Sequence, residues 1–363
     1  MKKNAAEKYD RNMAVNNNSD EGLRYIPIST EGIRLGGFAF CSAGETLRRL
    51  PDDPALSKAV NILAMHTAGG RIDFRSNTTR IWVKVKLQQS CHMDHMPDVG
   101  SCGFDLYIGE PGKSFMLGTS RCAGEADEFV SKLNDYALPG NMQNFTINFP
   151  LYSGIESLLI GVDKDAEILP PAPWKNNKKM VFYGTSITQG GCASRPGMAY
   201  TNILSRRFNL EAYNFGFSGN GRGEPEVAQH LANIPDPACY VLDYEPNAFP
   251  EGIRATLEQF IDILREKHPQ TPIFVMSSLR FNREISLTSS PDIQVGYLAE
   301  SARFQQSVVR KRRKAGDKNI HFIHGGKIAG KDWHEFAVDG IHQTDLGFFV
   351  IAGKMEKILK KVL

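Results

Sequence analysis

The sequence has no long hydrophobic run, no paired cysteine motif and no excess of charge of either sign. No stretch reaches the ~20 consecutive apolar residues that a membrane-spanning helix needs, so we expect no membrane partner. The 43 basic and 40 acidic residues leave a net charge of only +3, so we expect no nucleic-acid partner. The one basic run, residues 310–314 (RKRRK), follows a helical pattern, and cations at a helix C-terminus complement the helix dipole.

Cysteine spacing also argues against a metal centre. The six cysteines are scattered, and no two have the CxxC spacing of a zinc ribbon or a redox motif. In the run CHMDHM, Cys91, His92, Asp94 and His95 alternate badly for one strand face. No second ligand pair is spaced to complete a tetrahedral site. We therefore predict no metal, and we expect His95 to line a substrate site instead.

Leader and cofactor motifs are missing as well. The N-terminus begins with basic residues but lacks the apolar segment of a signal peptide, so the chain as written is predicted to be cytoplasmic. Removal of an earlier leader would make it secreted or periplasmic. The glycines of residues 219–223 do not continue as GxGxxG, and there is no GxxxxGK[ST] loop, so we predict no cofactor. Position 188 is threonine, so Ser186 does not lie in a GxSxG elbow.

The patterns that are present divide the chain into two parts. At 363 residues it exceeds the size at which single cores usually stop growing. From 20 to 169 the apolar residues recur with period two, as in residues 80–87 (RIWVKVKL), which predicts a jelly-roll-like β-sandwich of antiparallel strands. Three of the four residues 170–173 are proline and form a stiff seam. A second domain is expected over 174–363.

In the second part, short apolar strands alternate with helical patterns. The clearest helix is predicted over 252–268, and a last helix over about 345–362. This alternation predicts a parallel sheet of about five strands with helices on both faces, a three-layer α/β/α domain. The five expected strands are residues 180–183, 212–217, 239–242, 273–276 and 320–323.

Polar residues follow the ends of these strands. In such a sheet, ligands bind beyond the carboxyl ends of the strands, so four segments distant in sequence should meet at one rim. Asp339 and His342 follow the fifth strand and precede the last helix. The residues that follow the first three strands are Ser186, Gly219, Asn220 and Asn247.

These residue types fit nucleophilic catalysis at an acyl carbon. A serine hydroxyl needs a neighbouring base, and His342 is the candidate, with Asp339 to orient its ring. The N–H groups of Ser186 and Gly219 and the amide of Asn247 are candidates for the oxyanion hole. Each assignment has a structural alternative: Ser186 as a helix N-cap, His342 capping or packing beside the last helix, Asp339 in a turn, Gly219 easing a turn, and Asn247 in an Asx-turn.

The same residues resemble the SGNH (GDSL-type) hydrolase family of esterases, lipases and acyltransferases. Its Gly-Asp-Ser-Leu block corresponds to residues 184–187 (GTSI), and its Asp-x-x-His block is complete at 339–342. Of its Gly-x-Asn-Asp block only Asn247 remains. The resemblance implies a flavodoxin-like fold and a Ser-His-Asp triad.

The first half resembles a β-sandwich module that precedes some SGNH hydrolases and carries a Gly-x-Asp-Leu-Tyr signature. Here that signature is residues 103–107 (GFDLY). Because side chains alternate along a strand, Asp105 and Tyr107 should lie opposite Phe104 and Leu106. We expect Asp105 and Tyr107 to pack between the domains or to border the site.

These observations predict a serine esterase that cleaves short-chain esters, most simply acetyl esters of a small molecule or carbohydrate, through an acyl-enzyme. His95, Asn220 and Trp333 are expected to contact the substrate. An acyltransferase with the same triad is one alternative. A carbohydrate-binding protein with an inactive hydrolase domain is another.

Overall fold

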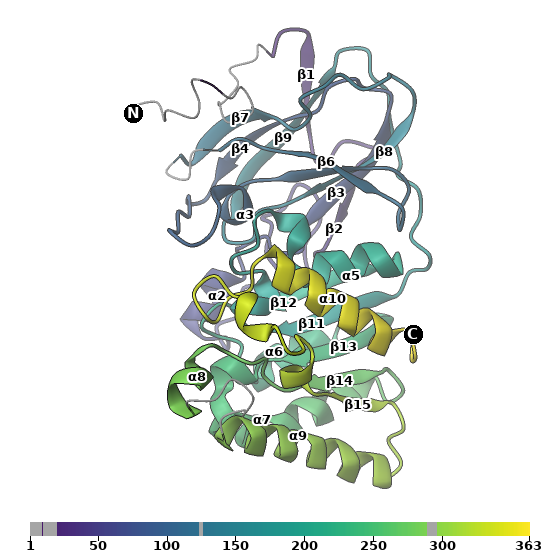
Figure 1. The fold of residues 1–363 in the computed structure, drawn as a ribbon. Helices are drawn as coiled ribbons and strands as arrows, with labels where there is room; N and C mark the ends of the chain where they lie inside the picture. The colour runs from purple at the N-terminus through teal and green to yellow at the C-terminus, as the bar shows by residue number, and fades with distance from the viewer. Residues whose placement is uncertain (1–8, 10–19, 123–125, 289–295) are drawn as a thin grey trace.

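The computed structural model describes residues 9, 20–122, 126–288 and 296–363. Most of the N-terminal segment on which the localisation prediction rests therefore lies outside the described residues. The first half of the chain stacks on the second, as Figure 1 shows. Within the described ranges, each helix is too short or too polar to cross a membrane.

The first half consists of two antiparallel sheets around one core. Ile81, Val83, Val85 and Leu87 all point into that core, as their period-two spacing predicted. One sheet has the order β1 (Leu23–Pro27), β9 (Ile155–Asp163), β4 (Trp82–Leu87), β7 (Glu128–Lys132). The other has the order β10 (Ile168–Leu169), β3 (Arg71–Ser76), β8 (Gln143–Asn148), β5 (Asp105–Ile108), β6 (Phe115–Thr119), with β2 (Arg34–Gly36) paired to β3.

The second half is built on a five-stranded parallel sheet, which confirms the predicted fold class. Its strand order, second-first-third-fourth-fifth along the chain, is that of flavodoxin-like folds. Each strand covers the segment predicted for it, within two residues at either end. In sheet order the strands are β12 (Glu211–Gly216), β11 (Lys179–Gly184), β13 (Pro237–Asp243), β14 (Ile273–Met276) and β15 (Ile320–Ile323).

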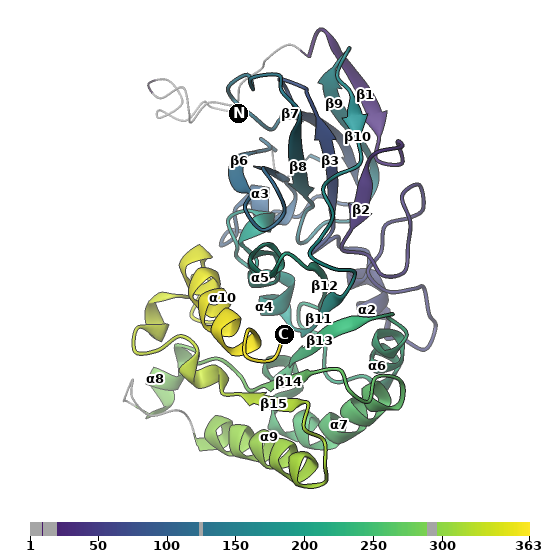
Figure 2. The same cartoon turned by 90° about the vertical axis from the view of Figure 1, so that its right-hand side faces the viewer.

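Helices cover both faces of this sheet, as Figure 2 shows. Along β11, Met180 and Phe182 belong to one apolar cluster and Val181 and Tyr183 to the other, because successive side chains point to opposite faces. One face carries α5 (Tyr200–Phe208) and α10 (Asp345–Leu359). The other carries α6 (Pro225–Ala232), α7 (Glu245–Lys267) and α9 (Gly296–Lys314).

Helix α7 begins seven residues before the predicted start at 252, because it includes a kink. Phe249 has φ 55° and ψ 173°, and Pro250 begins the longer, straight part of the helix. Helix α10 ends at Leu359 rather than at 362. The remaining short helices are α2 (Lys58–Leu63), α3 (Asp98–Ser101), α4 (Ser186–Gln189), α8 (Arg283–Thr288) and 3₁₀ turns at Pro196–Met198, Gly325–Lys327 and Trp333–Glu335.

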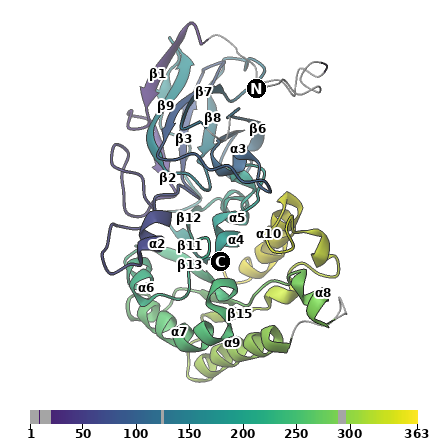
Figure 3. The same cartoon turned by 90° about the vertical axis from the view of Figure 1, so that its left-hand side faces the viewer.

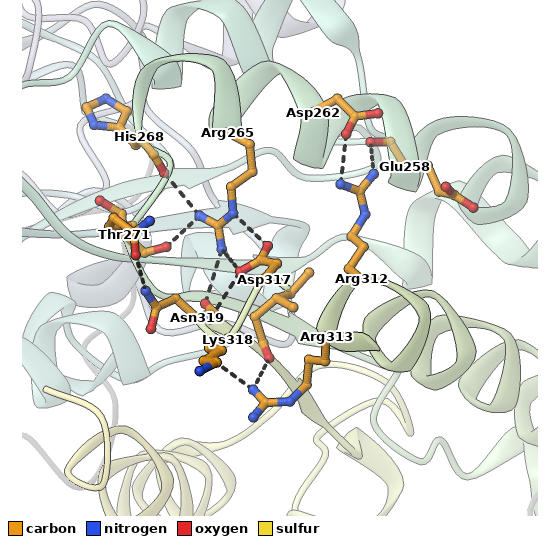
Figure 4. Close-up of polar contacts among 12 residues, drawn as sticks. Glu258, Asp262, Arg265, His268, Thr271, Arg312, Arg313, Asp317, Lys318 and Asn319 are labelled. Carbon is orange, nitrogen blue, oxygen red and sulfur yellow. Dashed lines mark hydrogen bonds and ion pairs between the residues drawn. The ribbon is translucent and has the colours of Figure 1, made fainter. Parts of the chain in front are cut away.

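The basic run ends α9, as predicted, and two of its arginines, Arg312 and Arg313, make contacts within the fold (Figure 4). Arg312 donates to the Asp262 carboxylate at 2.7 Å and to the Glu258 carbonyl at 2.9 Å, both on α7. Arg313 donates to the carbonyls of Lys318 and Ile320, which lead into β15. These contacts tie the end of α9 to its neighbours.

Part of the first half packs on the sheet of the second, which the sequence analysis did not foresee. Leu50, Leu56, Val60 and Ala64 join the apolar cluster on the face covered by α6 and α7. Figure 3 shows α2 beside β12 and α6. Residues 50–64 therefore complete the cover of this face near the edge strand β12.

Arg49 lies between the two halves and is 1 % exposed. Its guanidinium donates to the Leu63 and His66 carbonyls at 2.7 and 2.8 Å. It also donates to Asn214 and Gly216 of β12, at 3.0 and 2.5 Å. One buried cation thus satisfies carbonyl groups from both halves of the chain.

The Gly-x-Asp-Leu-Tyr signature forms a second junction. Phe104 and Leu106 lie in the sandwich core, while Asp105 and Tyr107 face the second half, as expected. The Asp105 carboxylate accepts hydrogen bonds from Arg195 at 2.8 Å and from the Gly197 N–H at 2.7 Å. The same Arg195 nitrogen donates to the Tyr107 hydroxyl at 2.7 Å. The signature therefore docks the sandwich onto the segment between α4 and α5.

Candidate active site

Ser186 lies on the first turn of α4, directly after β11. Thr185 caps this helix, because its side-chain oxygen accepts from the Ile187 N–H at 3.3 Å. The N-cap of α4 is therefore Thr185 and not Ser186. The Ser186 hydroxyl, in a residue that is 8 % exposed, lies 2.8 Å from Nε2 of His342.

Asp339 and His342 belong to one tight loop before α10. A bridge between Ala337 and Gln343 closes the loop, and the Val338 N–H donates to the His342 carbonyl at 2.9 Å. Gly340 has φ 85°, a left-handed conformation that glycine adopts without strain. The loop brings a carboxylate and an imidazole three residues apart onto the same side.

Asp339 contacts His342 through both carboxylate oxygens. Oδ2 lies 2.6 Å from Nδ1 of the ring, and Oδ1 accepts from the backbone N–H groups of His342 and Ile341 at 2.7 and 2.9 Å. Although partial burial opposes the shift, these hydrogen bonds lower the pKa of Asp339. The carboxylate is therefore ionised at neutral pH and able to stabilise a protonated His342 ring.

The loop after β12 carries Gly219 and Asn220. The Asn220 N–H donates to the Phe217 carbonyl at 2.9 Å, and Gly219 at the turn is exposed with φ 66°. The Asn220 side chain donates to the Ser218 carbonyl at 3.1 Å. Asn220 therefore stabilises the turn, and its contact with substrate stays a prediction.

The Asn247 side chain contacts the loop after β12. Its side-chain nitrogen donates to the Phe217 carbonyl at 3.2 Å and to the Asn220 carbonyl. An amide nitrogen has two hydrogens, and these two carbonyls occupy both. In this arrangement Asn247 holds the loop that carries Gly219, and its role as an oxyanion donor stays a prediction.

Gln189, on the same helix as Ser186, was missed by the sequence analysis. Its fully buried side chain accepts from the Ser218 N–H at 3.0 Å and donates to the Leu151 carbonyl at 2.9 Å. Its nitrogen also lies 3.1 Å from Nδ1 of His66. The sequence could have indicated this role, because Gln189 follows Ser186 by three residues. At that spacing its side chain points toward the end of β12, where it contacts Ser218, and not toward solvent.

His66, on the other side of Gln189, is neutral at physiological pH. Burial, together with the nearby charge of Arg49, lowers the pKa of His66 to about 4. A neutral ring can accept a hydrogen bond from Gln189. A chain of hydrogen bonds thus connects the first half of the molecule to α4 and the Gly219 loop.

His95 reaches the site from the first half, where the sequence predicted a site-lining residue. Its Nε2 lies 3.9 Å from Asp339 Oδ2, and its ring centre lies 6.0 Å from that of His342. Its Nδ1 is 3.1 Å from the Asp94 carboxylate. Trp333, by contrast, is only 4 % exposed and is covered by the Arg280 guanidinium at 4.2 Å. Trp333 is therefore buried under Arg280, and its contact with substrate stays a prediction.

A cavity of about 840 Å³ lies between the two halves, next to the loop that carries Asp339 and His342. One wall is residues 92–98 of the sandwich, and the other includes Cys192, Val338 and Leu346. Cys192 has φ 71°, and burial followed by the charges of Asp339 and Asp94 raises the pKa of its thiol to about 12. Residues from both halves of the chain therefore line this cavity.

The fold and these side chains define an SGNH-type α/β/α domain preceded by a β-sandwich. The chain belongs to the GDSL-like lipase/acylhydrolase family, whose sequence model matches residues 177–360. Residues 23–168 match the family described as the N-terminus of SGNH-hydrolase-type esterases, named for its GxDLY signature. The resemblance seen in residues 184–187, 339–342 and 103–107 is confirmed. No curated protein sequence matches the chain.

Solved structures show the same two-part architecture. A protein assigned as a GDSL-like lipase from Bacteroides ovatus is 33% identical, with a TM-score of 0.82, over 94% of this chain and 98% of that one. A salicylyl-acyltransferase from a tetracycline biosynthetic pathway is 19% identical with a TM-score of 0.75, over 94% and 99%. A family two carbohydrate esterase from Cellvibrio japonicus is 13% identical with a TM-score of 0.57, over 94% and 98%. The last two share the fold.

Proposed function

We propose that the protein is a serine esterase that cleaves short-chain esters through an acyl-enzyme. The observation that carries the proposal is the continuous chain of contacts from the Ser186 hydroxyl to His342, at 2.8 Å, and from His342 to Asp339, at 2.6 Å. Both distances allow direct proton transfer or hydrogen bonding. Family membership supports the same reaction class.

In this mechanism the Ser186 oxygen attacks the ester carbonyl while its proton passes to Nε2 of His342. Asp339 keeps the ring in the tautomer that has a free lone pair on Nε2, and it stabilises the imidazolium that forms. His342 then gives the proton to the leaving alcohol. Water repeats the sequence on the acyl-enzyme and releases the acid.

The oxyanion of each tetrahedral intermediate needs donors that are already in place. We assign this role to the backbone N–H groups of Ser186 and Gly219. The Ser186 N–H belongs to the first turn of α4, where backbone donors have no partner within the helix. The Gly219 turn is held by Asn247 and by Gln189 through Ser218. Side chains therefore fix the loop, and backbone donors bind the charge.

The proposed substrates are acetyl or similarly short esters of a polar alcohol such as a carbohydrate. The cavity beside the triad supports this, because His92, Asp94, His95 and Asp98 line it with groups that hydrogen-bond hydroxyls. A carbohydrate esterase shares the fold. These four side chains come from the sandwich, so the first half of the chain would select the alcohol.

The test is the cleavage of an aryl acetate by the wild type and by Ser186→Ala. Loss of a triad nucleophile commonly costs ~10⁶-fold in kcat, so the variant should be inactive while its circular dichroism is unchanged. Ser307→Ala, on the outer face of α9, is the matched control and should retain the full rate. A rate in Ser186→Ala above a tenth of wild type would contradict the assignment.

An acyltransferase would use the same triad with an alcohol in place of water. The cavity of about 840 Å³ is large enough for such an acceptor. Product analysis with and without added alcohols distinguishes the two reactions, because only a transferase yields mostly the new ester. An inactive wild type in all these assays would instead favour a carbohydrate-binding role.

A further inference from the structure

Three metal-ligating side chains meet beside the triad, from three distant segments of the chain. His95, Cys192 and His342 each offer a ligand atom, and these atoms all lie within 4.8 Å of one another. We propose that they form a binding site for a thiophilic divalent cation such as Zn²⁺, and that occupancy of this site inhibits the enzyme. The second half of this proposal rests on the proposed esterase function.

The donor set determines which cation fits. Two imidazole nitrogens and one thiolate are the ligands that Zn²⁺ and its analogues Co²⁺ and Cd²⁺ prefer, whereas Mg²⁺ and Ca²⁺ need oxygen ligands. Three protein ligands leave the fourth tetrahedral position for water. The spacing of the three atoms requires only a small inward movement of side chains, because His95 and His342 are both partly exposed.

Both histidines are already braced as metal-bound histidines usually are. Nδ1 of His95 lies 3.1 Å from the Asp94 carboxylate, and Nδ1 of His342 lies 2.6 Å from the Asp339 carboxylate. A carboxylate on one ring nitrogen fixes the orientation of the ring and strengthens the other nitrogen as a ligand. The site therefore has outer carboxylates as well as ligands.

Cys192 is held at the site in an unusual backbone conformation. Its φ of 71° is uncommon for a residue other than glycine, and such conformations concentrate at functional sites. The Cys192 N–H lies 3.4 Å from the sulfur of Met96, on the same loop as His95. The loop that supplies one ligand thus packs directly against the residue that supplies another.

A cation has a route to these ligands. The cavity of about 840 Å³ is lined by both His95 and Cys192. Carboxylates of Asp94, Asp98 and Asp345 line the same cavity, and their negative charge attracts cations to it. Binding there would consume a ring nitrogen of His342. Since one nitrogen faces Ser186 and the other Asp339, either mode of binding disables the general base.

Cobalt absorption tests the site without reference to activity. Titration of the full-length protein with Co²⁺ should produce a thiolate-to-cobalt charge-transfer band that is lost in Cys192→Ser and in Cys192→Gly. The glycine variant suits φ 71° and so guards against misfolding. Cys41→Ser, whose thiol lies elsewhere on the Arg48 carbonyl, is the control and should keep the band. No band in the wild type, or a band that survives in both Cys192 variants, would overturn the proposal.

Inhibition by Zn²⁺ tests the consequence. Aryl acetate cleavage by the wild type should fall on addition of Zn²⁺ and return on chelation, while Cys192→Gly should need at least about tenfold more Zn²⁺. Asp94→Asn should weaken inhibition by about 10–100-fold, as loss of an outer carboxylate does. Equal inhibition of the wild type and Cys192→Gly would contradict inhibition through this site. A wild type with a cobalt band but no esterase activity would refute the proposed function and leave the metal site intact.

Discussion

The Asn247 side chain contacts the backbone of the loop that carries Gly219. Its amide holds the carbonyls of Phe217 and Asn220 together, and Gly219 lies between them in the chain. The same side chain facing the cavity would instead bind the oxyanion directly. The two arrangements predict different behaviour for one substitution.

Asn247→Ala should lower both stability and turnover. Two hydrogen bonds are lost at about 0.5–1.5 kcal/mol each, so urea unfolding should show a decrease of roughly 1–3 kcal/mol in the free energy of unfolding. The rate constant kcat should fall as the Gly219 N–H loses its fixed position, with little change in KM. Asn177→Ala, at an exposed position before β11, is the control. A 10²–10³-fold drop in kcat at unchanged stability would show a direct oxyanion donor instead.

Asp243 is a buried acid that contacts α4, the short helix that carries the proposed nucleophile Ser186. It is 2 % exposed and accepts hydrogen bonds from Thr188 at 3.1 Å and Tyr200 at 3.3 Å. Burial raises the pKa of Asp243 from 3.8 to about 7, although the two hydroxyl donors oppose the shift. Folding therefore favours the protonated acid.

Because the pKa of Asp243 is raised in the folded state, this group makes the free energy of unfolding decrease as the pH rises. Between pH 4 and 7 the folded state binds more protons at Asp243 than the unfolded state, so its contribution to stability is complete below pH 4 and is lost as the pH rises to 7. Asp243→Asn should remove this loss. Urea titrations at pH 5 and 8 should show the wild type losing roughly 2–4 kcal/mol more than the variant. Parallel pH profiles for the two proteins would contradict the raised pKa.

At the scale of elements, α4 is one turn that depends on its neighbours for position. Thr185 caps it, Thr188 ties it to β13 through Asp243, and Gln189 ties it to the Ser218 backbone. A four-residue helix has too few internal hydrogen bonds to hold its own geometry. The position of Ser186 is therefore set by these three contacts.

Gln189→Ala should lower kcat by at least about tenfold with a smaller change in KM, because misplacement of reacting groups mainly affects the transition state. Gln89→Ala, an exposed glutamine in the first half, is the control. Steady-state kinetics on an aryl acetate measure both constants. An effect confined to KM would mean that Gln189 contacts substrate rather than positioning α4 and the Gly219 loop.

At the scale of the whole molecule, the two halves share one interior. Arg49 satisfies two carbonyls of β12, and residues 50–64 cover the apolar face beside it. Arg49→Met keeps the length of the side chain but removes all of these donors. We expect a loss of at least about 3 kcal/mol in the free energy of unfolding, since hydrogen bonds to charged groups contribute about 1.5–3 kcal/mol each. A variant with wild-type thermal stability would contradict this role.

Residues 172–363 expressed alone should fail to form an active domain. The fragment lacks the cover supplied by Leu50, Val60 and Ala64 and the cavity wall supplied by residues 92–98. Exposed apolar surface of this kind promotes aggregation. Circular dichroism and aryl acetate cleavage measure the outcome. A folded fragment that equals the full chain on an aryl acetate and on an acetylated sugar would show that the first half has no part in catalysis.

The sequence was sufficient to predict the layers of both halves and the strand ends that the candidate site residues follow, because both depend on local periodicity. Period two at residues 80–87 and the alternation of strands and helices after 179 are properties of neighbouring residues. What the sequence could not predict depends on distant packing. The burial of Trp333 under Arg280, the turn of the Asn247 amide toward the loop, and the meeting of His95 with Cys192 each involve separate segments.

The loop from Ala337 to Gln343 has one further consequence. It carries both the Asp339 carboxylate and the His342 imidazole, and contacts within its seven residues fix the two groups relative to each other. We therefore expect thermal motion of the rim to change the distance from Ser186 to His342 more than the distance from His342 to Asp339. For protein engineering, the loop could therefore be transferred as one unit. A designer who grafts it next to a serine needs to position one rigid loop and does not need to align three separate side chains with one another.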